Sequence, residues 1–125
     1  MRHRGYIAAV ISNSCAQRLR RAARYERTFC HHITMAYRPS KKIFAKYAAF
    51  IGKRVLFEVL ELVTDENGQA VRVSGVPCEN KHPHITVSCA PGIEPVYSNR
   101  LLARRNASTH RLTFSGVATI QFIPL

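Results

Sequence analysis

The tripeptide His-Ile-Thr occurs twice in this chain, in "HHITMAY" and in "HPHITVS". The residues able to do chemistry are His32 and Thr34 in the first segment, and His84 and Thr86 in the second. Because side chains alternate between the faces of a β-strand, each histidine would share a face with its threonine. Each segment therefore presents an imidazole and a hydroxyl side by side.

Two such segments can cleave a phosphodiester without a metal ion. A neutral imidazole can take a proton from the attacking water, while a protonated one gives its proton to the departing ribose oxygen. Histidine suits both tasks because its ordinary pKa lies near neutrality. The threonine hydroxyls can hydrogen-bond the non-bridging phosphate oxygens. We therefore expect His32 and His84 to be catalytic and Thr34 and Thr86 to bind phosphate, provided that the two strands lie close together.

The elements that must position these residues can be predicted from the pattern of the chain. Apolar and β-branched runs predict strands over residues 5–11, 28–37 and 83–90, and one or two more over 110–125. Amphipathic runs with cap residues predict helices over 12–25 and 40–52, and a short one over 94–105. Asn67-Gly68 predicts a hairpin within 53–76, because both residues tolerate positive φ. This order is typical of an α+β domain with a mainly antiparallel sheet.

The positive charge is concentrated in the first half of the chain. The net charge is +12, and residues 1–54 hold thirteen Lys and Arg but one acid. A polyanion such as RNA is the natural partner of that surface, because binding releases condensed counterions. The four cysteines form no C-x-x-C pair, which favours reduced thiols in the cytosol. The apolar run at 6–11 is too short to cross a bilayer and a poor signal peptide.

The segments His32-Ile33-Thr34-Met35 and His84-Ile85-Thr86-Val87 resemble the paired His-apolar-Thr/Ser-apolar motifs of the 2H phosphoesterases. That family includes the LigT-like RNA phosphodiesterases and the cyclic phosphodiesterase domains of fungal and plant tRNA ligases. The expected helix after the first motif, the hairpin before the second and the closing strand are also similar to the family's layout. The resemblance implies a single bilobal α+β domain over residues 1–125, in which mainly antiparallel sheets form a central cleft with flanking helices.

The resemblance also implies an activity. It is the metal-independent hydrolysis of a 2′,3′-cyclic phosphate, or of a related 2′-5′ or cyclic nucleotide phosphodiester, by two-histidine acid/base catalysis without a cofactor. The substrate would be an RNA end or a small cyclic oligonucleotide. A viral-type 2H enzyme acting on cyclic dinucleotide or 2′-5′ oligoadenylate immune signals is the alternative. We expect a cytoplasmic monomer that binds neither a metal nor a membrane.

Residues near the two His-Ile-Thr segments are candidates for binding the substrate. Aromatic and cationic side chains are the usual contacts of single-stranded nucleotides. The tentative substrate-binding set is Tyr37, Arg38, Lys81, His82 and Tyr97, with Asn99 as a weaker candidate. By strand alternation, His31 should point away from His32.

Three other functions are compatible with a basic, histidine-containing chain. A metal site could draw on Cys30, His31, His32, His82, His84 and Cys89, but their spacing matches no zinc pattern. A histidine-triad nucleotide hydrolase needs a third histidine where Thr86 stands. A non-catalytic basic RNA-binding module remains open, in which the histidines are incidental. Changing His32 or His84 to alanine separates that module from an enzyme, because only an enzyme would lose its function.

Overall fold

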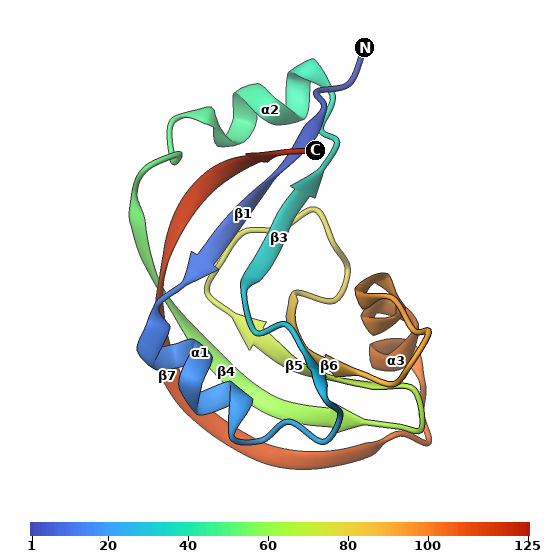
Figure 1. Cartoon of the computed structure of the whole chain (residues 1–125). Coiled ribbons are helices and arrows are strands. Elements are labelled where there is room, and N and C mark those ends of the chain that lie inside the picture. The colour runs from blue at the N-terminus through green and yellow to red at the C-terminus, as the bar shows by residue number, and fades with distance from the viewer.

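The computed structural model describes residues 1–125 (Figure 1). In chain order, the elements are β1 (Gly5–Ile11), α1 (Asn13–Arg20), β2 (Arg27–Thr28), β3 (His32–Tyr37), α2 (Lys41–Ala48), β4 (Arg54–Thr64), β5 (Gly68–Ser74), β6 (His84–Cys89), the 3-10 turn η1 (Pro95–Tyr97), α3 (Ser98–Ala103) and β7 (Ser108–Pro124). The order agrees with the expected one, with an additional two-residue strand, β2. The α+β class with antiparallel strands is confirmed.

Six of the strands close into a barrel. The hydrogen-bonded order is β6-β3-β1-β7-β4-β5, and β5 pairs with β6 to complete the ring, while β2 extends the edge beside β6. All these ladders are antiparallel. The long strand β7 pairs with β4 through residues 108–119 and with β1 through residues 118–124 (Figure 1). The strands therefore form one continuous sheet, and the two lobes implied by the resemblance do not correspond to separate sheets.

The barrel interior is the main hydrophobic core. Alternate residues of the strands point inward, and the largest fully buried ones include Ile7, Phe57, Val59, Val71 and Ile85. Helix α1 adds Cys15, Ala16 and Leu19 to this core. Helix α3 instead packs on the outer face, where Leu101 and Leu102 meet Val63 and Ala70. Helix α3 thus covers part of the outer face of β4 and β5, and the same outer face of the sheet carries the residues of interest on β3 and β6.

Two local predictions were wrong in detail. The hairpin exists, but neither Asn67 nor Gly68 has a positive φ. The turn is held instead by Asp65, whose carboxylate accepts hydrogen bonds from the backbone N–H groups of Asn67 and Gly68 at 2.8 and 3.0 Å. The expected strand 28–37 is split into β2 and β3, because Cys30 adopts φ +47° and interrupts the extended backbone.

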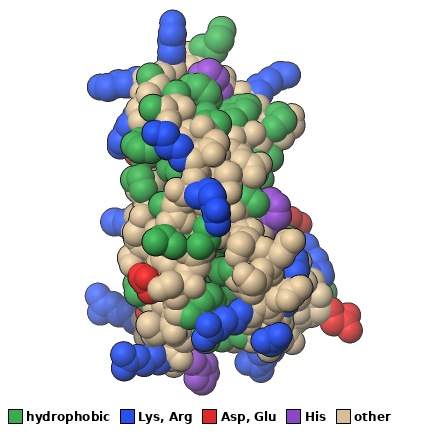
Figure 2. Space-filling view, turned by 90° about the vertical axis from the view of Figure 1, so that its left-hand side faces the viewer, with side chains coloured by type: hydrophobic (Ala, Val, Ile, Leu, Met, Phe, Trp, Pro, Cys, Tyr) green, Lys and Arg blue, Asp and Glu red, His purple; other side chains and the backbone are tan.

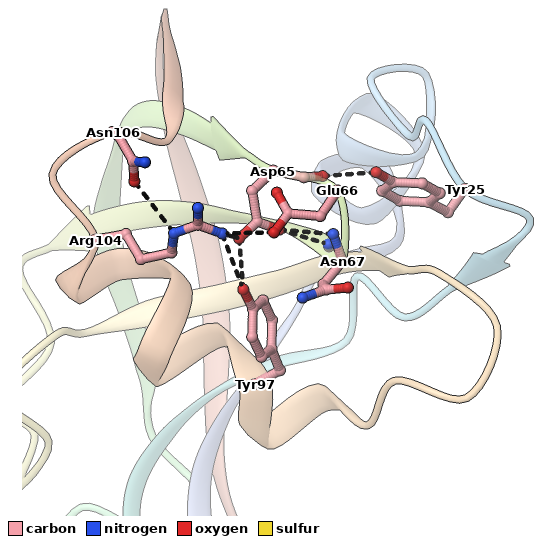
Figure 3. A network of polar contacts seen from close by, with 8 residues as sticks. Tyr25, Asp65, Glu66, Asn67, Tyr97, Arg104 and Asn106 are labelled. Atoms are coloured by element: carbon pink, nitrogen blue, oxygen red, sulfur yellow. Dashed lines mark hydrogen bonds and ion pairs between the residues drawn. The ribbon is translucent and has the colours of Figure 1, made fainter.

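The carboxylate of Asp65 also ties the hairpin to α3 (Figure 3). Its side chain is 3% exposed and accepts hydrogen bonds from the Tyr97 hydroxyl at 2.5 Å and the Arg104 guanidinium at 2.6 Å. Burial on its own would raise the pKa of Asp65, but these donors and the two turn N–H groups outweigh it and lower the pKa. Since Tyr97 and Arg104 flank α3, this buried ion pair fixes the helix over the outer face of the barrel.

The four cysteines are all free thiols. No helix of the chain has the length and apolar character needed to span a membrane.

The network around Asp65 gives a stability prediction. Asp65→Ala should lower the free energy of unfolding by about 3 kcal/mol, because it leaves Arg104 and two backbone donors without their acceptor. Glu66→Ala is the matched control: Glu66 binds the same guanidinium, but its side chain is 67% exposed and solvent screens the pair, so the loss should be far smaller than for Asp65→Ala. Urea denaturation of both variants checks this. Equal losses would mean that Asp65 does not anchor α3.

Candidate active site

The two His-Ile-Thr segments lie in neighbouring strands of the barrel. Ile33 of β3 is paired with Ile85 of β6 in antiparallel register, and both isoleucines are fully buried in the core. Since adjacent residues point to the opposite face, the flanking His32, Thr34, His84 and Thr86 lie together on the outer face. Antiparallel pairing places each histidine beside the threonine of the other strand. The two imidazoles therefore lie diagonally across one small square of side chains.

A large cavity opens over this square. Its volume is about 1050 Å³, and all four residues line it. The rest of the lining is Tyr6, Thr28, Phe29, His31, Met35, Ala36, Tyr37, Glu79, Asn80, Pro95, Val96 and Asn99. The walls therefore come from segments far apart in the chain: β1, β3, the residues before β6, and η1 with the start of α3. Its volume is that of a typical small-ligand or cofactor site.

His84 is held in one orientation by its own strand. Its ring Nδ1 lies 2.7 Å from the backbone oxygen of His82, so Nδ1 carries hydrogen and donates to that carbonyl. The other ring nitrogen, Nε2, is then left for chemistry. Burial lowers the pKa of His84, and the hydrogen bond to the carbonyl opposes that decrease.

His32 lies against a third histidine. The Nδ1 atoms of His31 and His32 are 2.9 Å apart, and the rings meet edge to face with centroids 5.1 Å apart. The prediction that His31 points away from His32 was wrong. The reason is the positive φ of Cys30, which precedes β3 and breaks the alternation at His31. The pKa of His32 falls to about 4, first because of burial and then because of repulsion by His31 and His84.

The hydroxyl of the second threonine, Thr86, is hydrogen-bonded to a buried serine. Thr86 Oγ1 lies 2.8 Å from the hydroxyl of Ser98, which is 2% exposed, and 3.4 Å from the backbone oxygen of Pro95. These contacts join β6 to the first residue of α3. The hydroxyl of Thr86 is thus fixed by the helix that Asp65 anchors.

The cavity contains almost no charge of its own. None of its lining residues is Lys or Arg, and its one acid is Glu79. Glu79 accepts hydrogen bonds from Lys46 at 2.8 Å and from Tyr47, and the Lys46 contact is the main reason that its pKa is lowered. The basic side chains lie elsewhere: Figure 2 shows Lys and Arg spread over one face of the molecule with few acids among them. Long-range attraction of an anion therefore comes from the surface rather than from the cavity.

The tentative substrate-binding residues lie in different places. Tyr37 lines the cavity beside Tyr6, with ring centroids 6.2 Å apart. Arg38 and Lys81 are exposed and outside the lining. His82 is also outside it, and acts on His84 through its backbone oxygen. Tyr97 lies behind the cavity with its hydroxyl on Asp65, whereas the weaker candidate Asn99 lines the cavity.

Sequence reasoning missed several residues of the cavity. Tyr6 comes from β1, its ring centroid 5.2 Å from that of His32, and Ser98 supports Thr86. Asn80 donates to the side-chain oxygen of Asn99 at 2.7 Å. No motif marks these positions, because they reach the site only through the closure of the barrel and the packing of α3. No three His, Cys, Asp or Glu side chains are grouped so that they could hold a metal ion.

The family of the chain follows from its sequence as a whole. Residues 24–122, well over half of the chain, match the family described as the fungal tRNA ligase phosphodiesterase domain. No match to an individual curated protein is significant. The matched region includes both His-Ile-Thr segments and all strands except β1 and the last two residues of β7. The match supports a hydrolase that acts on phosphodiester bonds, with RNA as its substrate. The chain belongs to the tRNA ligase cyclic phosphodiesterase domains, a family of the 2H phosphoesterase type.

Proposed function

We propose that this protein opens 2′,3′-cyclic phosphate ends of RNA by two-histidine acid/base catalysis without a metal ion. The observation that carries the proposal is the Ile33–Ile85 pairing, which brings both His-Thr pairs to one cavity. The family match supports cyclic phosphodiester chemistry on RNA. We further propose that residues 1–125 act as one monomeric two-lobed domain in the cytoplasm.

His32 is the general base in this proposal. Its pKa of about 4 keeps it neutral at physiological pH, which a base requires. When Nε2 of His32 takes a proton from water, the hydrogen on Nδ1 can be donated to Nδ1 of His31, 2.9 Å away. His31 would thus orient the base, as the third member of a nucleophile–base–orienter set does. The water oxygen then forms its bond to phosphorus.

His84 is the general acid. Its Nδ1 hydrogen bond to the His82 carbonyl leaves the proton on Nε2 available for the departing ribose oxygen as the phosphorus–oxygen bond breaks. In the free protein the pKa of His84 is lowered by burial, but a bound phosphodiester anion raises it by stabilising the imidazolium. Binding of the substrate thus favours the protonated form of His84, which then acts as the general acid.

The threonine hydroxyls hold the phosphate between the two imidazoles. Thr34 and Thr86 flank the buried pair from opposite strands, so each can donate to a different non-bridging oxygen. Ser98 fixes Thr86 in place, and since no Lys or Arg lines the cavity, the protonated His84 is the cation that meets the single negative charge of the cyclic phosphate.

The first prediction concerns the two imidazoles. His32→Ala and His84→Ala should each lower kcat on an RNA 2′,3′-cyclic phosphate by roughly 10²- to 10⁴-fold, and Thr34→Ala or Thr86→Ala by about tenfold to a hundredfold. The assay contains EDTA, and ³¹P NMR follows ring opening. His110→Ala, an exposed histidine on β7, is the matched control and should have full activity.

Parallel assays on 2′-5′ oligoadenylate and cyclic dinucleotides test the alternative substrates. Loss of activity in EDTA, or full activity of His32→Ala, would contradict the mechanism. Selective cleavage of a cyclic dinucleotide would show that the proposed substrate is wrong, but it would be consistent with the proposed mechanism.

The second prediction is the pH dependence of kcat/KM, which reports the free enzyme. Activity should fall below about pH 4, where His32 becomes protonated. Activity should also fall at higher pH, where His84 loses its proton. The midpoint of that alkaline limb should lie below pH 6.5, the ordinary pKa of histidine, because the pKa of His84 is lowered. The expected profile is a bell with its maximum at mildly acidic pH. A maximum above pH 7 would contradict this assignment of base and acid.

The third prediction isolates His31. His31→Ala removes both the acceptor for the His32 Nδ1 hydrogen and the repulsion by which His31 lowers the pKa of His32. The repulsion is the larger effect, so the acid limb of the kcat/KM profile should move to higher pH. The alkaline limb, which belongs to His84, should stay in place. His110→Ala is the matched control, because His110 is exposed on β7 and lies outside the cavity. An unshifted acid limb in His31→Ala would show that His31 does not act on the base.

A further inference from the structure

A second, smaller hollow adjoins the cavity. Its volume is about 310 Å³, and it shares Val96 and Asn99 with the cavity. Its other lining residues are Gly92, Ile93, Glu94, Tyr97 and Arg100. Val96 is 73% exposed and lines both depressions. A ligand longer than one nucleotide can therefore pass from the cavity over Val96 into the hollow.

The two depressions differ in charge. The cavity has no Lys or Arg in its lining, and the nearby Lys46 is paired with Glu79. The hollow has Arg100, an exposed residue of α3 with no side-chain hydrogen bond or ion pair. One reacting phosphodiester suits a cavity without Lys or Arg, whereas a further phosphate is bound better by a cation, because charge-assisted hydrogen bonds are the strong ones.

A second arginine lies at the junction. The guanidinium of Arg27 donates to the backbone oxygens of Ala90 at 3.2 Å and Ile93 at 2.8 Å, and lies 5.7 Å from the ring centroid of Phe29. Ile93 lines the hollow and Phe29 lines the cavity. Arg27 thus adds positive charge where the two depressions meet. The acid Glu94 also lines the hollow, together with Arg100, whereas Arg27 lies outside the lining.

The hollow also has an aromatic wall that cannot move freely. Tyr97 lines it, and its hydroxyl is held by Asp65 at 2.5 Å. Stacking of a base on a fixed aromatic ring is a common way to bind single-stranded RNA. The ring of Tyr97 can stack on a base, and the neighbouring Arg100 can bind a phosphate, so together they can hold one nucleotide.

We propose that this hollow binds the nucleotide on the 5′ side of the cyclic phosphate, with Arg100 on the connecting phosphate and the base against Tyr97. The inference rests on the proposed function, and it narrows the substrate to RNA ends of two or more nucleotides. A nucleoside 2′,3′-cyclic phosphate fills only the cavity and is a poor substrate.

The experiment compares uridine 2′,3′-cyclic phosphate with a trinucleotide that ends in the same group. The wild-type protein should have the higher kcat/KM on the trinucleotide. Arg100→Gln should lower that value about tenfold and leave the value for the nucleoside unchanged, because one charge-assisted contact is lost. It should also flatten the slope of log kcat/KM against log salt by about 0.7 for the trinucleotide. Arg54→Gln, an exposed arginine on β4, is the matched control and should change nothing.

The outcomes separate the two proposals. Equal kcat/KM values for both substrates in the wild-type protein would overturn the second subsite and leave the proposed function standing. An equal effect of Arg100→Gln on both substrates would do the same, because it would reveal a general effect on the site. If neither substrate is opened, the proposed function fails and this inference fails with it.

Discussion

The site depends on the pairing of two short strands, β3 and β6, through the buried residues Ile33 and Ile85. Burial of these isoleucines in the barrel core fixes the register, because a shift of one residue would turn every side chain to the opposite face. The same register places two imidazoles and two hydroxyls outside. The hydrophobic core therefore sets the geometry of the polar site, although the two lie on opposite faces of one sheet.

Closure of the barrel makes this pairing possible. The ring β6-β3-β1-β7-β4-β5 brings together segments about fifty residues apart, and β7 links β1 to β4 along its length. On the outer face, α3 is held by the Asp65 network and supplies Ser98 behind Thr86. A rigid frame of this kind is what a catalyst needs when its donors must be in place before charge develops on the phosphate.

Much of the site could be predicted from the sequence, because strand alternation needs only local information. His-Ile-Thr on any strand puts the histidine and threonine on one face. Both segments are also rich in β-branched residues, which favour strands. The partner strand of each segment could not be predicted, since pairing depends on the closed barrel. The position of His31 was predicted wrongly, because the positive φ of Cys30 leaves no sign in the residue type. The hairpin was predicted correctly, yet Asp65 forms its turn rather than positive φ at Asn67 or Gly68.

The most direct test of the account is a crystal structure of the protein with a ribonucleoside 2′- or 3′-phosphate product bound. The account predicts that the phosphate lies between Nε2 of His32 and Nε2 of His84, with a different phosphate oxygen about 3 Å from each ring. The hydroxyls of Thr34 and Thr86 should contact the remaining oxygens. A phosphate bound elsewhere on the basic surface, or one that touches a single histidine, would contradict the claim that both imidazoles act on one phosphorus atom.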